Sequence, residues 1–214
     1  MADRYWVGGA GTWNTTDTTH WSASSGGGAG ASAPTSADNV FFDALSNATA
    51  YAVTIGLTAV AANAADISIA GPLVGNVTIT SAATSVINCY GSWLNAATGV
   101  AFTSTAGSIV NFLATTTGKT ITNNGVSLGN LNLRFDSATG GWELGSALTL
   151  TTTISVLQGS FSTSTSSWGL TCGSIATSGT VVRSISLNAS LVSITGTTQI
   201  NFSAPNTTTP DEKL

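Results

Sequence analysis

The sequence contains very little charge. Asp, Glu, Lys and Arg together make up 7% of its 214 residues, against about a quarter in an average soluble protein. Only 5 residues are basic, too few for the positive stripe that nucleic-acid binding requires. The same shortage argues against binding to an anionic membrane surface. We therefore expect no nucleic-acid partner.

Residues that build metal sites and nucleophilic active sites are also scarce. The chain has 1 histidine, His20, and 2 cysteines, which cannot form a cluster of zinc ligands. A single histidine in the N-terminal segment also leaves no readable Ser-His-Asp arrangement. The sequence therefore predicts no metal, no cofactor and no enzymatic activity.

Carboxylates are rare in the body of the chain, which bears on glycan hydrolysis. Between residues 44 and 210 the acids are Asp66, Asp136 and Glu143. Strand alternation places Asp136 and Glu143 outward, where Asp136 is expected to pair with Arg134 on the surface. Neither acid has an evident apolar pocket that would raise its pKa. A glycan-cleaving enzyme is kept as a low-ranked alternative function.

The stretch "TTTGKT" resembles the end of a phosphate-binding loop, but the rest of that motif is missing. The position of its first glycine holds Leu113, and the residues after Lys119 read as a strand and turn. A phosphate loop needs a helix N-terminus at this point. Nucleotide binding is therefore not expected.

The chain has no long uninterrupted apolar run. Its most apolar window, residues 50–75, is broken by Asn63, Asp66 and Pro72, and its bulky residues alternate. This pattern indicates strands and no membrane insertion. The start "MADRYW" lacks the apolar region of a conventional signal peptide, so we expect synthesis in a cytoplasm.

From about residue 51 onward, apolar residues alternate with Thr, Ser or Asn. Such alternation is typical of strands, and no window shows a helical stripe. Short phrases also recur with variation, which is typical of repeat folds. They include "GNVTITSAA", "GSIVNFLATT" and "GNLNLRFDSATG". We predict an all-β protein, a right-handed parallel β-helix (β-solenoid) of roughly six to eight turns of about 18 to 25 residues. A β-sandwich or barrel is the alternative.

The predicted solenoid has three parts: an N-terminal Trp/Gly-rich cap at residues 1–45, a body at 46–204 and a polar tail at 205–214. An open solenoid end exposes strand edges and core, so it needs a cover. Five aromatic residues are predicted to pack over the first turn as this cap and are also candidates for an interface. They are Trp6, Trp13, Trp21, Phe41 and Phe42. A sugar-stacking platform is the alternative for the tryptophans.

Other polar residues of the cap have less specific signals. His20 is predicted to be a polar residue of the cap. Asp38, Asn39 and Asp43 have oxygen atoms that would suit a calcium ion, although turn hydrogen bonding is the preferred role. Whether calcium binds there stays open at this point.

The alternation also predicts which side chains face the core. Leu131, Leu133 and Phe135 are expected to face inward, as are Leu187 and Ile194. Thr151 and Thr195 are expected to face outward. Cys89 and Cys172 are separated by three to four predicted turns, too far for a disulfide. We therefore predict two free thiols, with Cys172 buried.

Two stretches resemble β-solenoid proteins of bacteriophage virions and of bacterial surface adhesins. The first is "YWVGGAGTWNTTDTTHWS…PTSADNVFFD", which resembles the W-G-G-x-G-x-W opening of that group; the second is "ALTLTTTISVLQGSF…VVRSISLNASLVSITGT". The resemblance covers about residues 4–43 and 147–197 and implies a right-handed parallel β-helix in a virion or adhesin. Its motifs are turn and packing patterns, informative for fold and weak for function. Secretion and anchoring regions of the large members are not seen, which favours the phage side.

These observations together predict a non-enzymatic structural protein of a bacteriophage virion. It would be a capsid decoration or cement protein or a tail-fibre component, with head or tail location left open. Its expected partners are itself, as a homotrimer, and other virion proteins. The alternative is a carbohydrate-binding adhesin or receptor-binding module, whose partners would be host-surface glycans.

Overall fold

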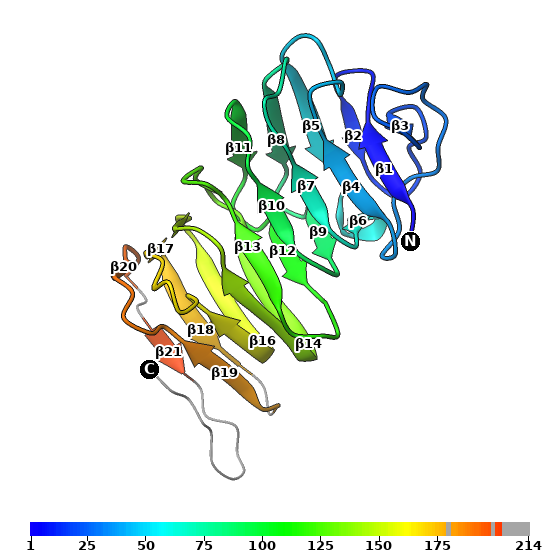
Figure 1. The fold of residues 1–214 in the computed structure, drawn as a ribbon. Helices are drawn as coiled ribbons and strands as arrows, with labels where there is room; N and C mark the ends of the chain where they lie inside the picture. Colours follow the sequence, from blue (N-terminus) through cyan, green and yellow to red (C-terminus); the bar gives the residue numbers. More distant parts are fainter. Residues whose placement is uncertain (179–180, 198–199, 203–214) are drawn as a thin grey trace.

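The computed structural model describes residues 1–178, 181–197 and 200–202 (Figure 1). These residues form an all-β solenoid of about 7 turns, and the one helical segment among them is a 3-10 turn at Thr58–Val60. The predicted solenoid is therefore confirmed, and the sandwich or barrel is not observed. The tail predicted at 205–214 lies outside the described residues. The right-handed course stays a prediction.

The strands lie in columns, one above another, because each pairs in parallel with the strand one turn later. Face A is the column that begins at the N-terminus. It consists of β1 (Asp3–Trp6), β4 (Asn39–Phe42), β7 (Ile67–Ile69), β10 (Trp93–Asn95), β13 (Lys119–Thr122), the second halves of β14 (Asn132–Leu144) and β16 (Thr153–Ser162), and β19 (Arg183–Ser186). β3 (Trp21–Ser22) adds to β1 in the antiparallel direction.

Two further columns complete the turns. Face B consists of β2 (Gly11–Trp13), β5 (Tyr51–Ile55), β8 (Val77–Ser81) and β11 (Val100–Ser104). In later turns a separate sheet holds β15 (Leu148–Thr149), β17 (Leu170–Cys172) and β20 (Val192–Ile194). Face C consists of β6 (Ala62–Ala64), β9 (Val86–Cys89), β12 (Ile109–Phe112), the first halves of β14 and β16, β18 (Ser174–Thr177) and β21 (Ile200–Phe202).

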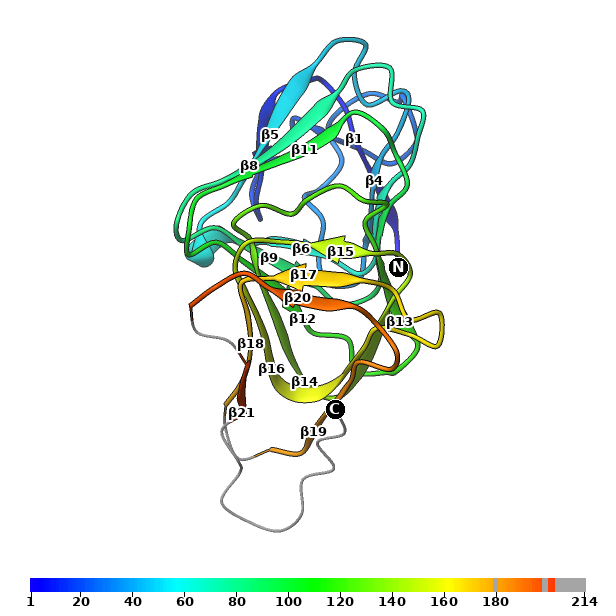
Figure 2. The same ribbon diagram turned by 90° about the vertical axis from the view of Figure 1, so that its left-hand side faces the viewer.

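The two long strands join faces C and A. β14 and β16 curve round beneath β15, β17 and β20 (Figure 2). The pairing between them shifts register on both sides of Asp136, and such irregularity lets a strand turn a corner. Faces A and C therefore belong to one continuous 14-stranded sheet.

The interior is a stack of apolar side chains. Phe135 packs between Phe112 and Phe161, with ring centroids 4.9 Å apart in each pair. This distance matches the spacing of neighbouring strands, about 4.8 Å. Phe112 and Phe135 are register partners on face C, whereas Phe161 reaches Phe135 from face A, where its own partner is Trp142.

The outer side carries ladders of uncharged polar residues. On face C, Asn88 donates to Asn63 at 3.1 Å, and Asn111 donates to Asn88 at 2.9 Å. On face B, Thr80 donates to Thr54 at 3.2 Å. Like charges would repel at this spacing, whereas amides and hydroxyls both donate and accept. The scarcity of charge follows from this stacking.

Most of the predicted orientations are confirmed. Leu131, Leu133 and Phe135 are buried, and Thr151 and Thr195 are exposed. Arg134 pairs with Asp136 at 2.6 Å on the outer side, as expected. Leu187 and Ile194 are only partly buried against the core, because they belong to the last described turn and no later turn covers them among the described residues.

Both cysteines are free and buried, which confirms the two free thiols and the burial of Cys172 that the sequence predicted. Burial raises the pKa of Cys89 to about 12 and that of Cys172 to about 11. Because the thiolate is the reactive form, we expect both thiols to serve as packing residues at neutral pH.

No helix of the described residues is long and apolar enough to cross a membrane.

Candidate functional site

Four of the five aromatic residues predicted for the cap form one buried cluster, whereas Phe41 lies on the outer side of β4 and stacks on Tyr5. The exposed fractions of Trp6, Trp13, Trp21 and Phe42 do not exceed 2%. Trp6 meets Trp21 edge-on at 5.0 Å and stacks on Phe42 at 5.7 Å. β3, which carries Trp21, lies at the end of the sheet beside β1. This packing is what a cap requires, while burial leaves these four rings no free face for a sugar.

Glycines explain the spacing of the opening motif. Gly8 and Gly9 have φ of +83° and +85°, a backbone region that favours glycine, and they make the turn between β1 and β2. Gly11 faces the ring of His20, with no room for a Cβ. His20 in turn stacks on Trp6 at 5.0 Å. The glycines of the motif therefore allow the tight turn and the close packing of His20 and Trp6.

His20 is held in place by an acidic neighbour. Its Nδ1 lies 2.6 Å from a carboxylate oxygen of Asp17. Burial would raise the pKa of Asp17, but hydrogen bonds from Thr19 and His20 and the charge of His20 outweigh it, and the pKa is lowered. His20 is thus a polar residue at the edge of the aromatic cluster.

The residues considered for calcium do not share one site. Asp38 accepts hydrogen bonds from Ala2 and Thr35, whereas Asp43 accepts one from the backbone of Leu45. Asn39 donates to Asp3 at 3.0 Å. Within the described ranges, no group of three or more His, Cys, Asp or Glu could hold a metal ion. The three side chains act in separate hydrogen bonds.

Acid is expected to weaken the hydrogen bonds of Asp38. Burial would raise its pKa, but hydrogen bonds from Thr35 and Ala2 and the charge of Arg4 hold it below 3.8. A carboxylate whose pKa is lower in the folded than in the unfolded protein stabilises the fold at pH values above its unfolded-state pKa. This contribution is lost as the pH falls through the folded-state pKa. Asp38→Asn should lower the free energy of unfolding by about 1–3 kcal/mol at pH 7. The difference in melting temperature between Asp38→Asn and the wild type should become smaller below about pH 4. A difference in melting temperature that stays the same at all pH values would contradict the predicted role of the Asp38 carboxylate.

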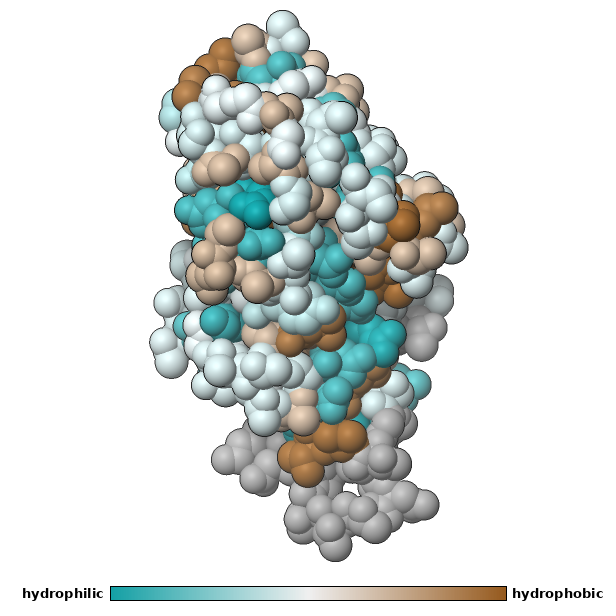
Figure 3. All heavy atoms as spheres, turned by 90° about the vertical axis from the view of Figure 1, so that its right-hand side faces the viewer, coloured by the Kyte–Doolittle hydropathy of each residue, from teal (hydrophilic) through white to brown (hydrophobic). Residues whose placement is uncertain are grey.

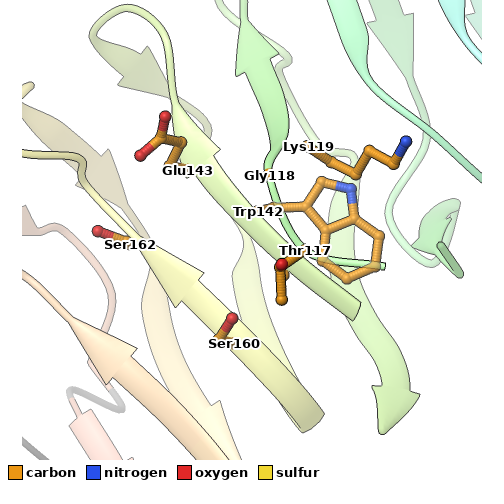
Figure 4. Close-up of a pocket in the computed structure, with 8 residues that line it drawn as sticks. Thr117, Gly118, Lys119, Trp142, Glu143, Ser160 and Ser162 are labelled. Atoms are coloured by element: carbon orange, nitrogen blue, oxygen red, sulfur yellow. The ribbon is translucent and has the colours of Figure 1, made fainter. Parts of the chain in front are cut away.

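A shallow hollow of about 150 Å³ lies over β13, β14 and β16. It contains the "TTTGKT" stretch, whose Gly118 makes a turn at φ +77° before strand β13. The strand confirms that a phosphate loop is absent here. Glu143 and Lys119 point away from each other, on opposite sides of Trp142 (Figure 4). Glu143 therefore faces neither a second carboxylate nor a cation in this hollow.

A polar column along the outer side of face A was not predicted from the sequence. Asp3 and Asn39 begin β1 and β4, Asp66 and Ser92 come just before β7 and β10, and hydrogen bonds join the four residues. Asn39 accepts from the backbone of Asp66 at 3.4 Å, and Asp66 accepts from the backbone of Ser92 at 2.7 Å. The signal in the sequence is a polar residue at or just before the start of β1, β4, β7 and β10, but turns of unequal length obscure it.

Comparison with known proteins finds no matching family model, curated protein or solved structure. The structure supports the resemblance to phage and adhesin solenoids at the level of the solenoid fold alone. Function has to be inferred from the geometry of the chain itself.

Proposed function

We propose that this protein is a non-enzymatic structural component of a bacteriophage virion that acts through protein-protein contacts. In this role it is a capsid decoration or cement protein or a tail-fibre component, made in the host cytoplasm and assembled as a homotrimer. The observation that supports the proposal is the group of exposed apolar side chains beside strand edges at the C-terminal end of the described residues.

The last described strands of the solenoid pair on one side only. Among the described residues, β19 pairs with β16, β20 with β17 and β21 with β18, each on one side only. An exposed strand edge is a template for pairing with another chain. At the N-terminal end, β3 pairs with β1, whereas within the described ranges β2 and β6 also pair on one side only.

Apolar side chains surround these edges. Val182 and Leu191 are 78% and 83% exposed, and Leu187, Val192 and Ile194 pack only partly against the core. Covering apolar area contributes about 25 cal/mol per Å². A subunit docked on this end would therefore bury both the side chains and the edges, which favours the C-terminal end as the contact region.

The sides of the solenoid are suited to close packing in an assembly. The face in Figure 3 is mostly pale, of intermediate hydropathy, with strongly hydrophilic and hydrophobic residues in limited groups. Charge normally keeps soluble proteins apart, and this chain has a charged fraction of 7%. Hydroxyl and amide ladders can exchange water for a partner at little cost.

Two measurements test this function. Light scattering on the purified protein at micromolar concentration should give a trimer, and the protein should rebind phage particles that lack it. Val182→Asp places a charge at the C-terminal end and should weaken self-association on the order of tenfold or more. Val74→Asp is the matched control, because Val74 is also exposed, at 64%, but lies between β7 and β8. A monodisperse wild-type monomer that does not rebind particles would overturn the proposal.

A further inference from the structure

A second column of side chains lies beside the polar column on the outer side of face A. Tyr5, Phe41, Ser68 and Leu94 are successive register partners on the outer side of β1, β4, β7 and β10. Tyr5 and Phe41 stack with ring centroids 4.8 Å apart and planes 17° apart. Ser68 has no ring, so the stack stops there. Leu94, one strand further, is 38% exposed.

The missing ring leaves a slot of defined width. Neighbouring strands are about 4.8 Å apart, so Phe41 and Leu94 lie on strands about 9.6 Å apart. A ring placed over Ser68 would lie one strand spacing from each, as Tyr5 lies from Phe41. A hollow of about 270 Å³ is found at this place. The slot therefore has room for a single ring, with Phe41 on one side and Leu94 on the other.

One long edge of the slot is polar and fixed in place. Asn39, Asp66, Ser92 and Thr120 line it. Asp66 Oδ1 accepts the backbone N–H of Ser92 at 2.7 Å, and Gly91 leaves the space that this carboxylate occupies, because a Cβ there would collide with it. Asp66 is therefore held against the slot without movement on binding, which lowers the entropy loss of binding.

The chemistry of these walls selects the occupant. Phe41 and Leu94 require a ring with an apolar face, whereas an ionised carboxylate accepts hydrogen bonds and cannot donate them. A pyranose ring has both C–H groups on its face and hydroxyl donors at its rim. An aromatic side chain would fill the slot but would bring few donors to Asp66. Asp66 is the charged residue that lines the hollow, so an anionic uronate would be repelled.

We propose that this slot binds one neutral pyranose ring of a glycan, with Phe41 against its face and Asp66 accepting from its hydroxyls. The site goes beyond the structural role proposed above and does not depend on it, because it lies on the side of the solenoid near the N-terminal end. Pockets with apolar walls and few fixed polar groups are typical ligand sites.

Binding can be tested with methyl glycosides of glucose, galactose and mannose, using saturation-transfer NMR followed by titration. At least one should bind, with a dissociation constant of about 1–10 mM, as expected for a small ligand in an open site. Methyl glucuronide should bind at least tenfold more weakly. Phenol serves as the aromatic probe.

Three variants separate the slot from the fold. Ser68→Phe continues the Tyr5–Phe41 stack into the slot and should abolish binding while keeping or raising the melting temperature. Asp66→Asn keeps the shape and removes the charge, and should weaken binding about tenfold. Thr122→Phe is the control, because Thr122 pairs with Leu94 on the side away from the slot, and it should bind as wild type does.

Several results would overturn the site. They are the absence of binding by all three glycosides, unchanged binding by folded Ser68→Phe, or binding of phenol alone. None of these would alter the light-scattering result for Val182→Asp, so failure of the slot and failure of the structural role are distinguishable.

Discussion

Replacing Phe135 with aspartate is expected to leave little folded protein at 25 °C. Phe135 is 0% exposed and lies between Phe112 and Phe161, 4.9 Å from each. Losing the ring costs about 3–5 kcal/mol, and an unpaired charge at the same place adds several more. Total stabilities of about 5–15 kcal/mol are usual, so the substitution removes most or all of the folding free energy.

The measurement is the free energy of unfolding from urea melts, followed by circular dichroism. Thr151→Ser is the control, because Thr151 is exposed and serine keeps the hydroxyl that donates to the Gly129 carbonyl at 2.9 Å. It should change stability by less than about 1 kcal/mol. Similar losses for the two variants would show that the inner and outer sides of β14 and its neighbours are assigned wrongly.

Replacing Trp21 with alanine is expected to lower the melting temperature by about 6–20 °C. Trp21 is 0% exposed and touches both Trp6 and Trp13, at 5.0 and 5.8 Å. Removal of a buried tryptophan costs about 3–5 kcal/mol, and each kcal/mol corresponds to about 2–4 °C for a chain of this size. Because solenoid turns contact mainly their neighbours, the loss should begin at the N-terminal end.

Trp168→Ala is the matched control for this substitution. Trp168 is 39% exposed, so its removal should cost much less. Hydrogen exchange should show faster exchange in β1, β2 and β4 for Trp21→Ala and no such change for Trp168→Ala. Equal melting temperatures for the two variants, or uniform loss of protection along the chain, would contradict the predicted role of residues 1–45 as a cap.

The orientation of side chains in the strands could be predicted well from the sequence. In "LNLRFD" the alternation alone placed Leu133 and Phe135 inside and Arg134 outside, because successive side chains of a strand point to opposite faces. The same rule put Leu187 and Ile194 on the inner side, but their burial is partial. Burial depends on the turn that follows, and alternation within one strand contains no information about that turn.

The candidate slot on face A could not be predicted in the same way. Phe41, Ser68 and Leu94 become neighbours only through the register of β4, β7 and β10. Asn63, Asn88 and Asn111 show why this register is hard to read, since they are aligned although 25 and 23 residues separate them. Loops of unequal length at the corners change the repeat without changing the strands.

The sequence by itself determined the fold class, the inward and outward sides of the strands, the free thiols and the absence of a phosphate loop. These are local properties, set by alternation, turn residues and residue counts over a few positions. The tertiary structure alone decided which residues stack between turns, how deeply the aromatic cluster is buried and, among the described residues, which strands pair on one side only. Those properties depend on hydrogen bonds between strands more than 20 residues apart, whose register is selected by the packing of the whole core.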